Sequence, residues 1–245
     1  MRDQGTIASI ASRIPQIIHQ TWKDESIPDS WLDLQASWKR HHPRWEYRLW
    51  VDGDLRELIR VDYSWFLPIY DAYPEHITRV DAARYFIMHK YGGLYVDLDF
   101  ESLRSIEPLL GESAVVAGLE PASHVSHPLA RERGLNKIVC NALLASRPAH
   151  AFWEHVFEQL VASRHLPGPL DAAGPFLLTR AVCSYAQPSD IMLVPAELVY
   201  PISNEESWNG RLDDAGIRAQ LSRTAFAIHH WHGTWVRDDN SVGER

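Results

Sequence analysis

The sequence predicts an α/β fold in which a mostly parallel central sheet is covered by helices. Short apolar runs typical of buried strands alternate along the chain with longer segments whose apolar residues recur at helical spacing, and this alternation is typical of parallel sheets. The chain has 245 residues, of which 45% are hydrophobic and 23% are charged, as in ordinary globular proteins. We therefore expect a single domain over residues 1–245.

Charge and cysteine content exclude several classes of protein. The formal net charge is −8, whereas nucleic-acid binders usually present a basic face, so we expect no nucleic-acid partner. Cys140 and Cys183 are too few for a disulfide scaffold or a zinc site of paired cysteines. We find neither a signal peptide nor an apolar run of about 20 residues. These features predict a cytoplasmic protein, and the 10 Trp and several basic clusters leave room for peripheral contact with the inner face of a membrane.

The first part of the chain is predicted to hold two strands and three helices. A capping box beginning at Ser30 opens the first helix, Pro43 ends it, and Asp52-Gly53-Asp54 is predicted to be a turn. The predicted elements are a strand over 14–20, a helix from 30 towards 41, a strand over 47–51, and helices over 54–60 and 65–73.

The next helix is predicted to begin at a second capping box, at Thr78, and to stop at Gly92-Gly93. A short strand over 94–96 follows, and Asp97 and Asp99 stand at its exit, where ligands bind in parallel sheets. Further strands are predicted over 114–119, 140–145, 191–194 and 225–229, and helices over 149–163 and 175–185.

Asp97 and Asp99 form an Asp-x-Asp pair. On an extended backbone residues i and i+2 point to the same side, so the two carboxylates would converge and a divalent cation would offset their repulsion. Mg²⁺ and Mn²⁺ prefer such oxygen ligands and often share them with substrate phosphates. An isolated Asp-x-Asp also occurs as a solvated turn, so the interpretation depends on the residues around it.

Asp81 and Arg84 lie one helical turn apart and so share a helix face. An Arg is a natural counter-charge for a diphosphate, and an Asp can accept hydrogen bonds from ribose or sugar hydroxyls. The alternative is structural, with Asp81 as the third residue of the Thr78 capping box and Arg84 as its ion-pair partner.

These residues resemble the DXD sugar-binding region of glycosyltransferase family 32, which has the GT-A fold. The matching segments are Arg79-Val80-Asp81-Ala82-Ala83-Arg84-Tyr85 and Tyr91-Gly92-Gly93-Leu94-Tyr95-Val96-Asp97-Leu98-Asp99. The family includes yeast-type α-mannosyltransferases and mannosyltransferases of inositol phosphoceramide, and the glucosylating domain of clostridial toxins shares the pattern. The resemblance extends from Ile14 to Trp235.

The resemblance implies a division of labour within one domain. Residues 14–110 would form the half that binds nucleotide and metal, and residues 111–245 the half that binds sugar and acceptor. Asp81, Arg84 and Asp99 would be catalytic, with Asp81 and Arg84 also contacting the sugar. The nucleotide would be bound by Trp22, Asp81, Arg84, Asp97, Gly233 and Trp235, with Trp22 stacked on the base. Asn141 and Gly174 would contact the sugar.

The run from His229 to Trp235 contains three His and two Trp. It lacks the further ligands of a structural zinc site. By the resemblance, the metal would be held by Asp97, Asp99 and His230, with His232 as the alternative to His230 and His229 assigned a structural role. An imidazole ligand favours Mn²⁺ over Mg²⁺.

The predicted activity is transfer of a hexose, with retention of configuration, from a UDP- or GDP-hexose to a glycan or glycolipid acceptor. The resemblance suggests bacterial surface polysaccharide or glycolipid synthesis as the setting. Two alternatives stay open at this point: a toxin-like transferase that modifies a protein acceptor, and a non-catalytic carbohydrate-binding protein.

Overall fold

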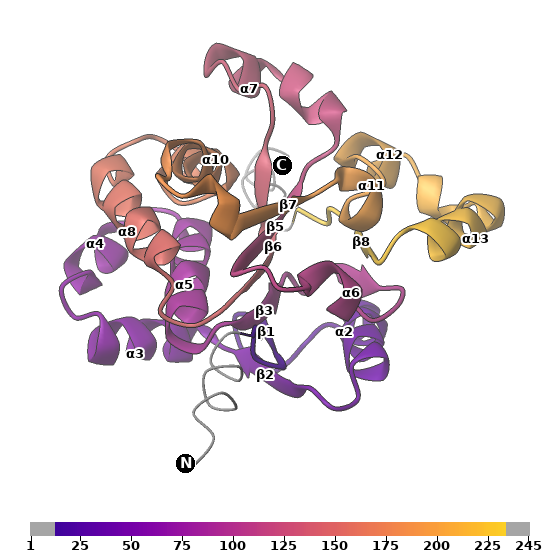
Figure 1. Ribbon diagram of the computed structural model, residues 1–245, viewed down its shortest axis with the longest axis horizontal. Coiled ribbons are helices and arrows are strands. Elements are labelled where there is room, and N and C mark those ends of the chain that lie inside the picture. Colours follow the sequence, from indigo (N-terminus) through magenta and orange to yellow (C-terminus); the bar gives the residue numbers. More distant parts are fainter. Residues whose placement is uncertain (1–12, 234–245) are drawn as a thin grey trace, which may run out of the picture.

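A computed structural model describes residues 13–233, and these form a six-stranded sheet between two layers of helices (Figure 1). The strand order is β2-β1-β3-β6-β5-β7. Three neighbouring pairs are parallel, and β6 is antiparallel to both of its neighbours. The expected mostly parallel α/β architecture is therefore confirmed.

The strands, in chain order, are β1 (Ile17–Thr21), β2 (Glu46–Trp50), β3 (Gly93–Val96), β4 (Phe100–Ser102), β5 (Val115–Leu119), β6 (Val139–Ser146), β7 (Ile191–Val194) and β8 (Ala227–His229). The helices are α2 (Asp29–His41), α3 (Asp52–Asp62), α4 (Leu67–Ala72), α5 (His76–Tyr91), α6 (Glu107–Leu110), α7 (Pro128–Glu132), α8 (Ala151–Ser163), α9 (Pro169–Ala172), α10 (Pro175–Ser184), α11 (Ala196–Val199), α12 (Asn204–Trp208) and α13 (Ala215–Thr224). Strands β4 and β8 pair antiparallel in a separate two-stranded ribbon.

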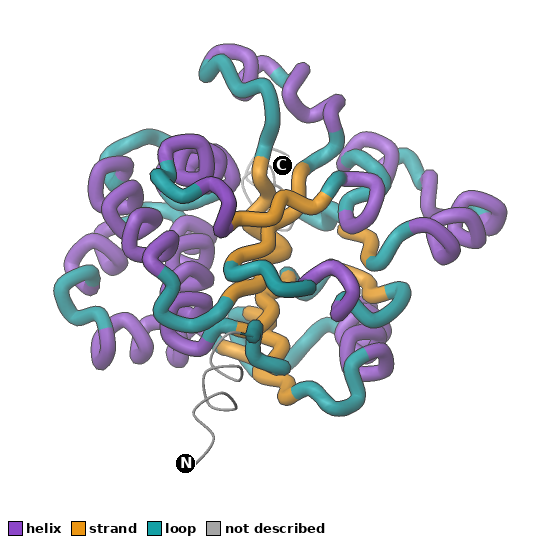
Figure 2. The backbone as a smooth tube through the Cα atoms, viewed as in Figure 1, coloured by secondary structure: helices purple, strands orange, loops and turns teal. Residues whose placement is uncertain are grey.

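Each face of the sheet packs against its own set of helices (Figure 2). Helices α3, α4, α5, α8 and α10 cover one face in a core that includes Tyr95 and Leu144, whereas α2, α6 and α11 cover the other in a core that includes Leu94 and Leu143. Successive residues of β3 and β6 therefore enter opposite cores, as strand geometry requires. Within the part of the chain that the structure describes, no helix is both long and apolar enough to cross a membrane.

The Gly92-Gly93 pair lets β3 begin directly after α5. Both residues have positive φ, +62° and +86°. A Cβ on Gly93 would lie 2.6 Å from the carbonyl oxygen of Ile17 in the neighbouring strand β1, so only glycine allows this close approach. The imidazole of His19 in β1 completes the junction, with its Nε2 3.0 Å from the carbonyl oxygen of Gly92.

Three local predictions are wrong. Neither Ser30 nor Thr78 caps a helix, because α2 begins at Asp29 after Pro28 and α5 begins at His76. The segment Asp52-Gly53-Asp54 is the first turn of α3 and not a separate turn. The sequence analysis also missed several short elements, among them β4, α7, α9 and α12, whose short sequences carry little periodicity and whose form depends on tertiary contacts.

The predicted division at residue 110 does not separate two folding units. Strands from both halves belong to the same sheet, with β3 bonded to β6. Whether the halves divide nucleotide and sugar binding between them stays a prediction.

Candidate active site

The predicted site residues gather at one edge of the sheet. Because β1, β2 and β3 are mutually parallel and β6 is antiparallel to both β3 and β5, strands β1, β2, β3, β5 and β7 all end at the same edge. Asp97 follows β3 directly at this edge, which is where ligands bind in open α/β sheets.

Asp97 and Asp99 belong to a tight turn, not to the extended strand that we expected. The amide of Phe100 donates to the carbonyl oxygen of Asp97 at 3.1 Å, which closes the turn between β3 and β4. The two carboxylates still converge: one oxygen of each, together with a ring nitrogen of His229, lie within 4.8 Å of one another.

Arg84 links Asp81 to Asp97, two of the three aspartates of the predicted site. Its guanidinium lies 2.8 Å from Asp81 and 3.3 Å from Asp97, and it donates to the backbone carbonyl of Asn141 at 2.8 Å. Arg84 is only 2% exposed. Burial alone would lower its pKa, but Asp97 and Asp81 hold the pKa above its usual value, so the guanidinium remains charged. Its Nε is buried and has no hydrogen-bond partner among the described residues.

Asp81, Asn141 and Gly174, three of the residues predicted to bind the sugar, lie together beside Arg84; their contact with a sugar stays a prediction. The side-chain amide of Asn141 donates to Asp81 at 3.0 Å. A Cβ on Gly174 would lie 3.3 Å from the other carboxylate oxygen of Asp81, so the loop before α10 is packed against this aspartate. Burial raises the pKa of Asp81 to about 6.

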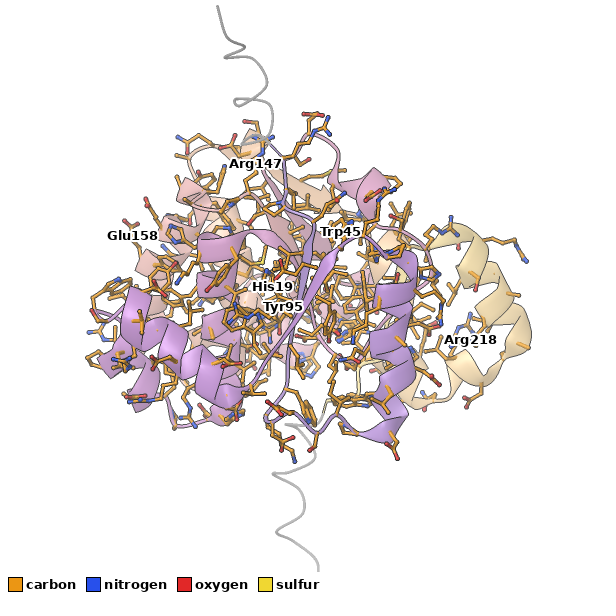
Figure 3. All side chains as sticks on the ribbon, turned by 90° about the horizontal axis from the view of Figure 1, so that it is seen from below. His19, Trp45, Tyr95, Arg147, Glu158 and Arg218 are labelled. Atoms are coloured by element: carbon orange, nitrogen blue, oxygen red, sulfur yellow. The ribbon has the colours of Figure 1, made fainter. Side chains whose placement is uncertain are left out.

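Tyr95 is a site residue that the sequence analysis missed. Its hydroxyl donates to Asp97 at 2.7 Å and lies 2.9 Å from the hydroxyl of Thr21 at the end of β1. Figure 3 shows His19 and Tyr95 close together near the centre of the molecule, where β1 pairs with β3. The signal was available, because the alternation of a strand places Tyr95 and Asp97 on the same side.

The C-terminal histidines are not arranged as the sequence analysis expected. In β8 the Nε2 of His229 lies 3.0 Å from Asp99, whereas the Nε2 of His230 lies 3.0 Å from Glu101 in β4. The antiparallel pairing of β8 with β4 explains this, since successive side chains of a strand face opposite sides. The structure thus brings His229, and not His230, to the Asp97–Asp99 pair.

The chain turns sharply after β8 and returns towards Asp99. Trp231 has φ +53°, a conformation that non-glycine residues rarely adopt, and the next amide, of His232, donates to Asp99 at 2.9 Å. Trp208 of α12 donates its indole N–H to the carbonyl of Trp231 at 2.6 Å. Gly233 also has positive φ, +54°. Trp235 lies outside the described residues.

Trp22 lies beside this C-terminal segment. Its ring packs edge-on against Trp31 of α2 at 4.6 Å between centroids, and Trp31 in turn stacks on His232 at 5.5 Å. The structure therefore joins the end of β1 to the C-terminal motif through three rings. Stacking of Trp22 on a nucleotide base stays a prediction.

The electrostatics of Asp97, Asp99 and His229 fit a divalent cation. Burial raises the pKa of Asp97. Burial would also raise the pKa of Asp99, but the imidazolium of His229 holds it well below its usual value. Burial would lower the pKa of His229, but Asp99 raises it, so a bound cation would replace the proton of this pair. Carboxylates and imidazole are both ligands of divalent metal ions in proteins, and the buried Nδ1 of His229 has no hydrogen-bond partner among residues 13–233. A cavity of about 640 Å³ lined by Tyr63 and Trp65 lies elsewhere, and nothing ties it to this chemistry.

Comparison with known proteins identifies relatives of the chain. Residues 28–116 match the family described as "Glycosyltransferase sugar-binding region containing DXD motif". The chain is 33% identical over 234 residues to inositol phosphoceramide mannosyltransferase 1 of Schizosaccharomyces pombe. The aligned region covers 88% of this chain and 68% of that protein. It is also 36% identical over 147 residues to mannosyl phosphorylinositol ceramide synthase SUR1 of Saccharomyces cerevisiae. That aligned region covers 60% of this chain and 35% of the yeast protein.

Solved structures share the fold at low sequence identity. The structure titled "PaToxG Glycosyltransferase" has a TM-score of 0.55 and 15% identity, and the match covers 86% of this chain and 79% of that one. A galactosyltransferase, LgtC, in complex with donor and acceptor sugar analogs has a TM-score of 0.51 and 16% identity, over 93% of this chain and 92% of that one. These neighbours confirm the expected GT-A architecture.

Proposed function

Because this chain belongs to the glycosyltransferase family whose sugar-binding region contains the DXD motif, we propose that it transfers a hexose from a nucleotide diphosphate sugar to a lipid-linked hydroxyl, with a divalent cation. One observation carries the proposal: Asp97, Asp99 and His229 offer three ligand atoms within 4.8 Å of one another, next to a buried guanidinium. When bound there, Mn²⁺ or Mg²⁺ would stabilise the negative charge that develops on the departing diphosphate.

Buried residues around the carboxylates would hold the donor. We assign Asp97 to the ribose and metal, and Asp99 and His229 to the metal. Arg84 keeps its positive charge beside Asp97 at 3.3 Å, so it would face the diphosphate and hold Asp97 in place. The charge is already buried and fixed before the reaction, and such preorganised charges stabilise a transition state without reorganisation.

The sugar of the donor would lie against Asp81, Asn141 and Gly174. Asp81 accepts from Asn141 at 3.0 Å, which fixes the orientation of its carboxylate. The absence of a Cβ at Gly174 lets its backbone pack against Asp81, since a Cβ there would lie 3.3 Å from the carboxylate. The same carboxylate also pairs with Arg84 at 2.8 Å. Both contacts are made by the same oxygen, Oδ1. They orient the carboxylate and share its charge with Arg84, which does not favour Asp81 as a covalent nucleophile.

The proposed stereochemical course is retention by front-face attack. In this course the acceptor hydroxyl attacks on the face from which the diphosphate leaves, and the departing phosphate oxygen takes the hydroxyl proton. Catalysis would come mainly from positioning and electrostatics. Trapping of a glycosyl–enzyme adduct on Asp81 or another carboxylate would overturn this course.

We propose mannose as the sugar and an inositol-phosphate lipid as the acceptor. The support is that the relatives described above are named for mannosylation of inositol phosphoceramide or of phosphorylinositol ceramide. These relatives are yeast proteins, so they give no support to the bacterial polysaccharide setting expected from the sequence. The first of them is matched over 68% of its length and the second over 35%.

The decisive experiment compares GDP-mannose with UDP-hexoses in thermal shift and in transfer to inositol phosphoceramide. A ligand at 100 times its Kd stabilises the fold by about 2.7 kcal/mol, so GDP-mannose with Mn²⁺ should raise Tm more than the UDP-hexoses. Product is followed by mass spectrometry. A preference for a UDP-hexose, or donor hydrolysis that is no slower without acceptor, would overturn the assignment.

Asp99→Asn should abolish the metal-dependent shift and the transfer. Asp33→Asn is the matched control, because Asp33 is an exposed aspartate of α2 far from β3 in the chain. Equal loss in both variants would show that the effect is not specific to the proposed metal site.

A further inference from the structure

The segment between β5 and β6 leaves the body of the molecule. Residues 121–138, which we call the β5–β6 excursion, contain a 3-10 turn at Ala122–Ser126 and helix α7. Figure 1 shows α7 beyond the ends of the strands, with no other labelled element at its level. The excursion therefore projects beyond the ends of the strands in this view.

The excursion leaves from the same edge of the sheet as the candidate active site. It follows β5, and β5 runs in the same direction as β3 because both are antiparallel to β6. Asp97 follows β3 at that edge. A membrane or protein that contacts the excursion would thus face the same edge of the sheet as the candidate active site, where the sugar would be transferred to the acceptor.

The base of the excursion is fixed to the body. Arg133 donates to Asp171 at 2.6 Å, and Arg180 of α10 holds the other oxygen of the same carboxylate at 2.8 Å. Ala130 and Ile138 are buried in a small core with Phe176. The excursion is accordingly held in a defined position, and Asp171, the residue of α9 that anchors it, lies three residues before Gly174.

The outer residues of the excursion have no such structural role. Arg131 is exposed and Lys137 is partly exposed, and neither makes an ion pair or side-chain hydrogen bond with any residue between 13 and 233. Leu129, on the same short helix as Arg131, is 37% exposed. The excursion carries three Lys or Arg against one carboxylate, Glu132, in a chain whose net charge is −8. Its charge is thus opposite in sign to that of the whole protein.

We propose that the β5–β6 excursion docks the protein on a bilayer that contains anionic lipids. Arg131 and Lys137 would lie among the headgroups, and Leu129 would enter the boundary between headgroups and acyl chains. Cationic clusters are attracted to anionic leaflets, and an exposed apolar side chain adds binding by burial. The inference rests on the proposed function in one respect: if the acceptor is a lipid, docking at this edge brings the candidate active site close to it.

The test measures binding of the full chain to vesicles by co-sedimentation. The vesicles contain phosphatidylcholine alone, or phosphatidylcholine mixed with phosphatidylserine, whose headgroups give the surface a negative potential. The wild type should bind the anionic vesicles and release them at high salt. The double variant Arg131→Gln, Lys137→Gln should bind about 25-fold more weakly, since each neutralised cation is expected to cost about fivefold.

The matched control is Arg40→Gln, Arg44→Gln. Arg40 is exposed in the last turn of α2, and Arg44 is exposed in the connection from α2 to β2, so both precede the start of β2 at the opposite edge of the sheet. The charge change is the same. The control should bind like the wild type. Equal weakening in both double variants, or equal binding of the wild type to neutral and anionic vesicles, would overturn the proposal.

Binding of GDP-mannose with Mn²⁺, followed by thermal shift on the same samples, separates this inference from the proposed function. Retained vesicle binding without any nucleotide-sugar shift in the wild type would refute the transferase assignment and leave docking standing. A normal shift with no preference for anionic vesicles would do the reverse.

Discussion

The Nε2 atom of His229 lies 3.0 Å from a carboxylate oxygen of Asp99, across the β4–β8 pair. His229→Ala should therefore weaken activation by Mn²⁺ at least about tenfold, as loss of groups around a metal commonly does. Mn²⁺ titration of transferase activity and of Tm measures this directly.

His230→Ala is the matched comparison, because His230 faces Glu101 instead. It should leave the Mn²⁺ midpoint within about threefold, well below the loss expected at a metal ligand. If His230→Ala raises the midpoint strongly and His229→Ala does not, the histidine predicted from the sequence is the ligand after all.

Arg84→Leu should lower the free energy of unfolding by about 3–5 kcal/mol, since it leaves Asp81 and Asp97 buried without their positive partner. Urea denaturation of the metal-free protein measures the loss. Arg56→Leu provides the control, because the Arg56–Asp71 pair has a similar separation of 2.8 Å but is largely exposed, and exposed pairs contribute little. Similar losses in the two variants would contradict the role given to burial.

Acid should destabilise the fold through His19. Burial lowers the pKa of His19 to about 4 from the ordinary 6.5, and the indole of Trp50 donates to its Nδ1 at 3.0 Å, so Nε2 carries the proton that Gly92 accepts. The unfolded chain takes up a proton below pH 6.5, whereas the folded protein does so only near pH 4. Stability should fall as the pH drops through this window, by about 3 kcal/mol from this residue.

His19→Asn isolates that contribution. The variant is expected to be less stable at pH 7 and to have a shallower pH dependence, and the difference between the two urea-derived stability curves should close between pH 7 and pH 4. Parallel curves would mean that the imidazole does not titrate in this range.

Gly93→Ala should destabilise the protein far more than Gly111→Ala. Both glycines have positive φ, +86° and +49°, but an added Cβ meets the backbone oxygen of Ile17 at 2.6 Å only at Gly93, whereas nothing lies within 4 Å at Gly111. Gly111→Ala should cost about 1–2 kcal/mol from backbone strain alone. Thermal unfolding of the two variants compares them, and equal Tm losses would show that strand β1 yields to the extra methyl group.

The sequence predicted the larger part of the site because its motif lies on strongly patterned elements. The helix predicted from 78 to 91, the glycine pair and the apolar strand after it are close in sequence, and they bring Asp81, Arg84 and Asp97 together. Asn141 and Gly174 were assigned to the candidate site only because of the family resemblance. The structure places both of them next to Asp81.

The assignment among the histidines could not be read from the sequence. Which of His229 and His230 faces Asp99 depends on the register of β8 against β4, and β4 is a three-residue strand that follows the Asp97–Asp99 turn without any pattern of its own. A one-residue change of register exchanges the two faces of a strand. The predictions of the two helix starts were also wrong. Helix α2 begins at Asp29, directly after Pro28, and α5 begins at His76, two residues before Thr78.

Strand β6 has a consequence for how the chain is made. It joins β3 to β5, and all its residues are buried, so the sheet stays in two pieces until residue 146 has left the ribosome. Until then β3 and β5 present unpaired edges, which are templates for aggregation, and pairings as distant in sequence as His19 with Tyr95 slow folding. A nascent chain of this protein is therefore expected to depend on chaperone protection for more than half of its synthesis, and residues 1–110 expressed alone are expected to aggregate.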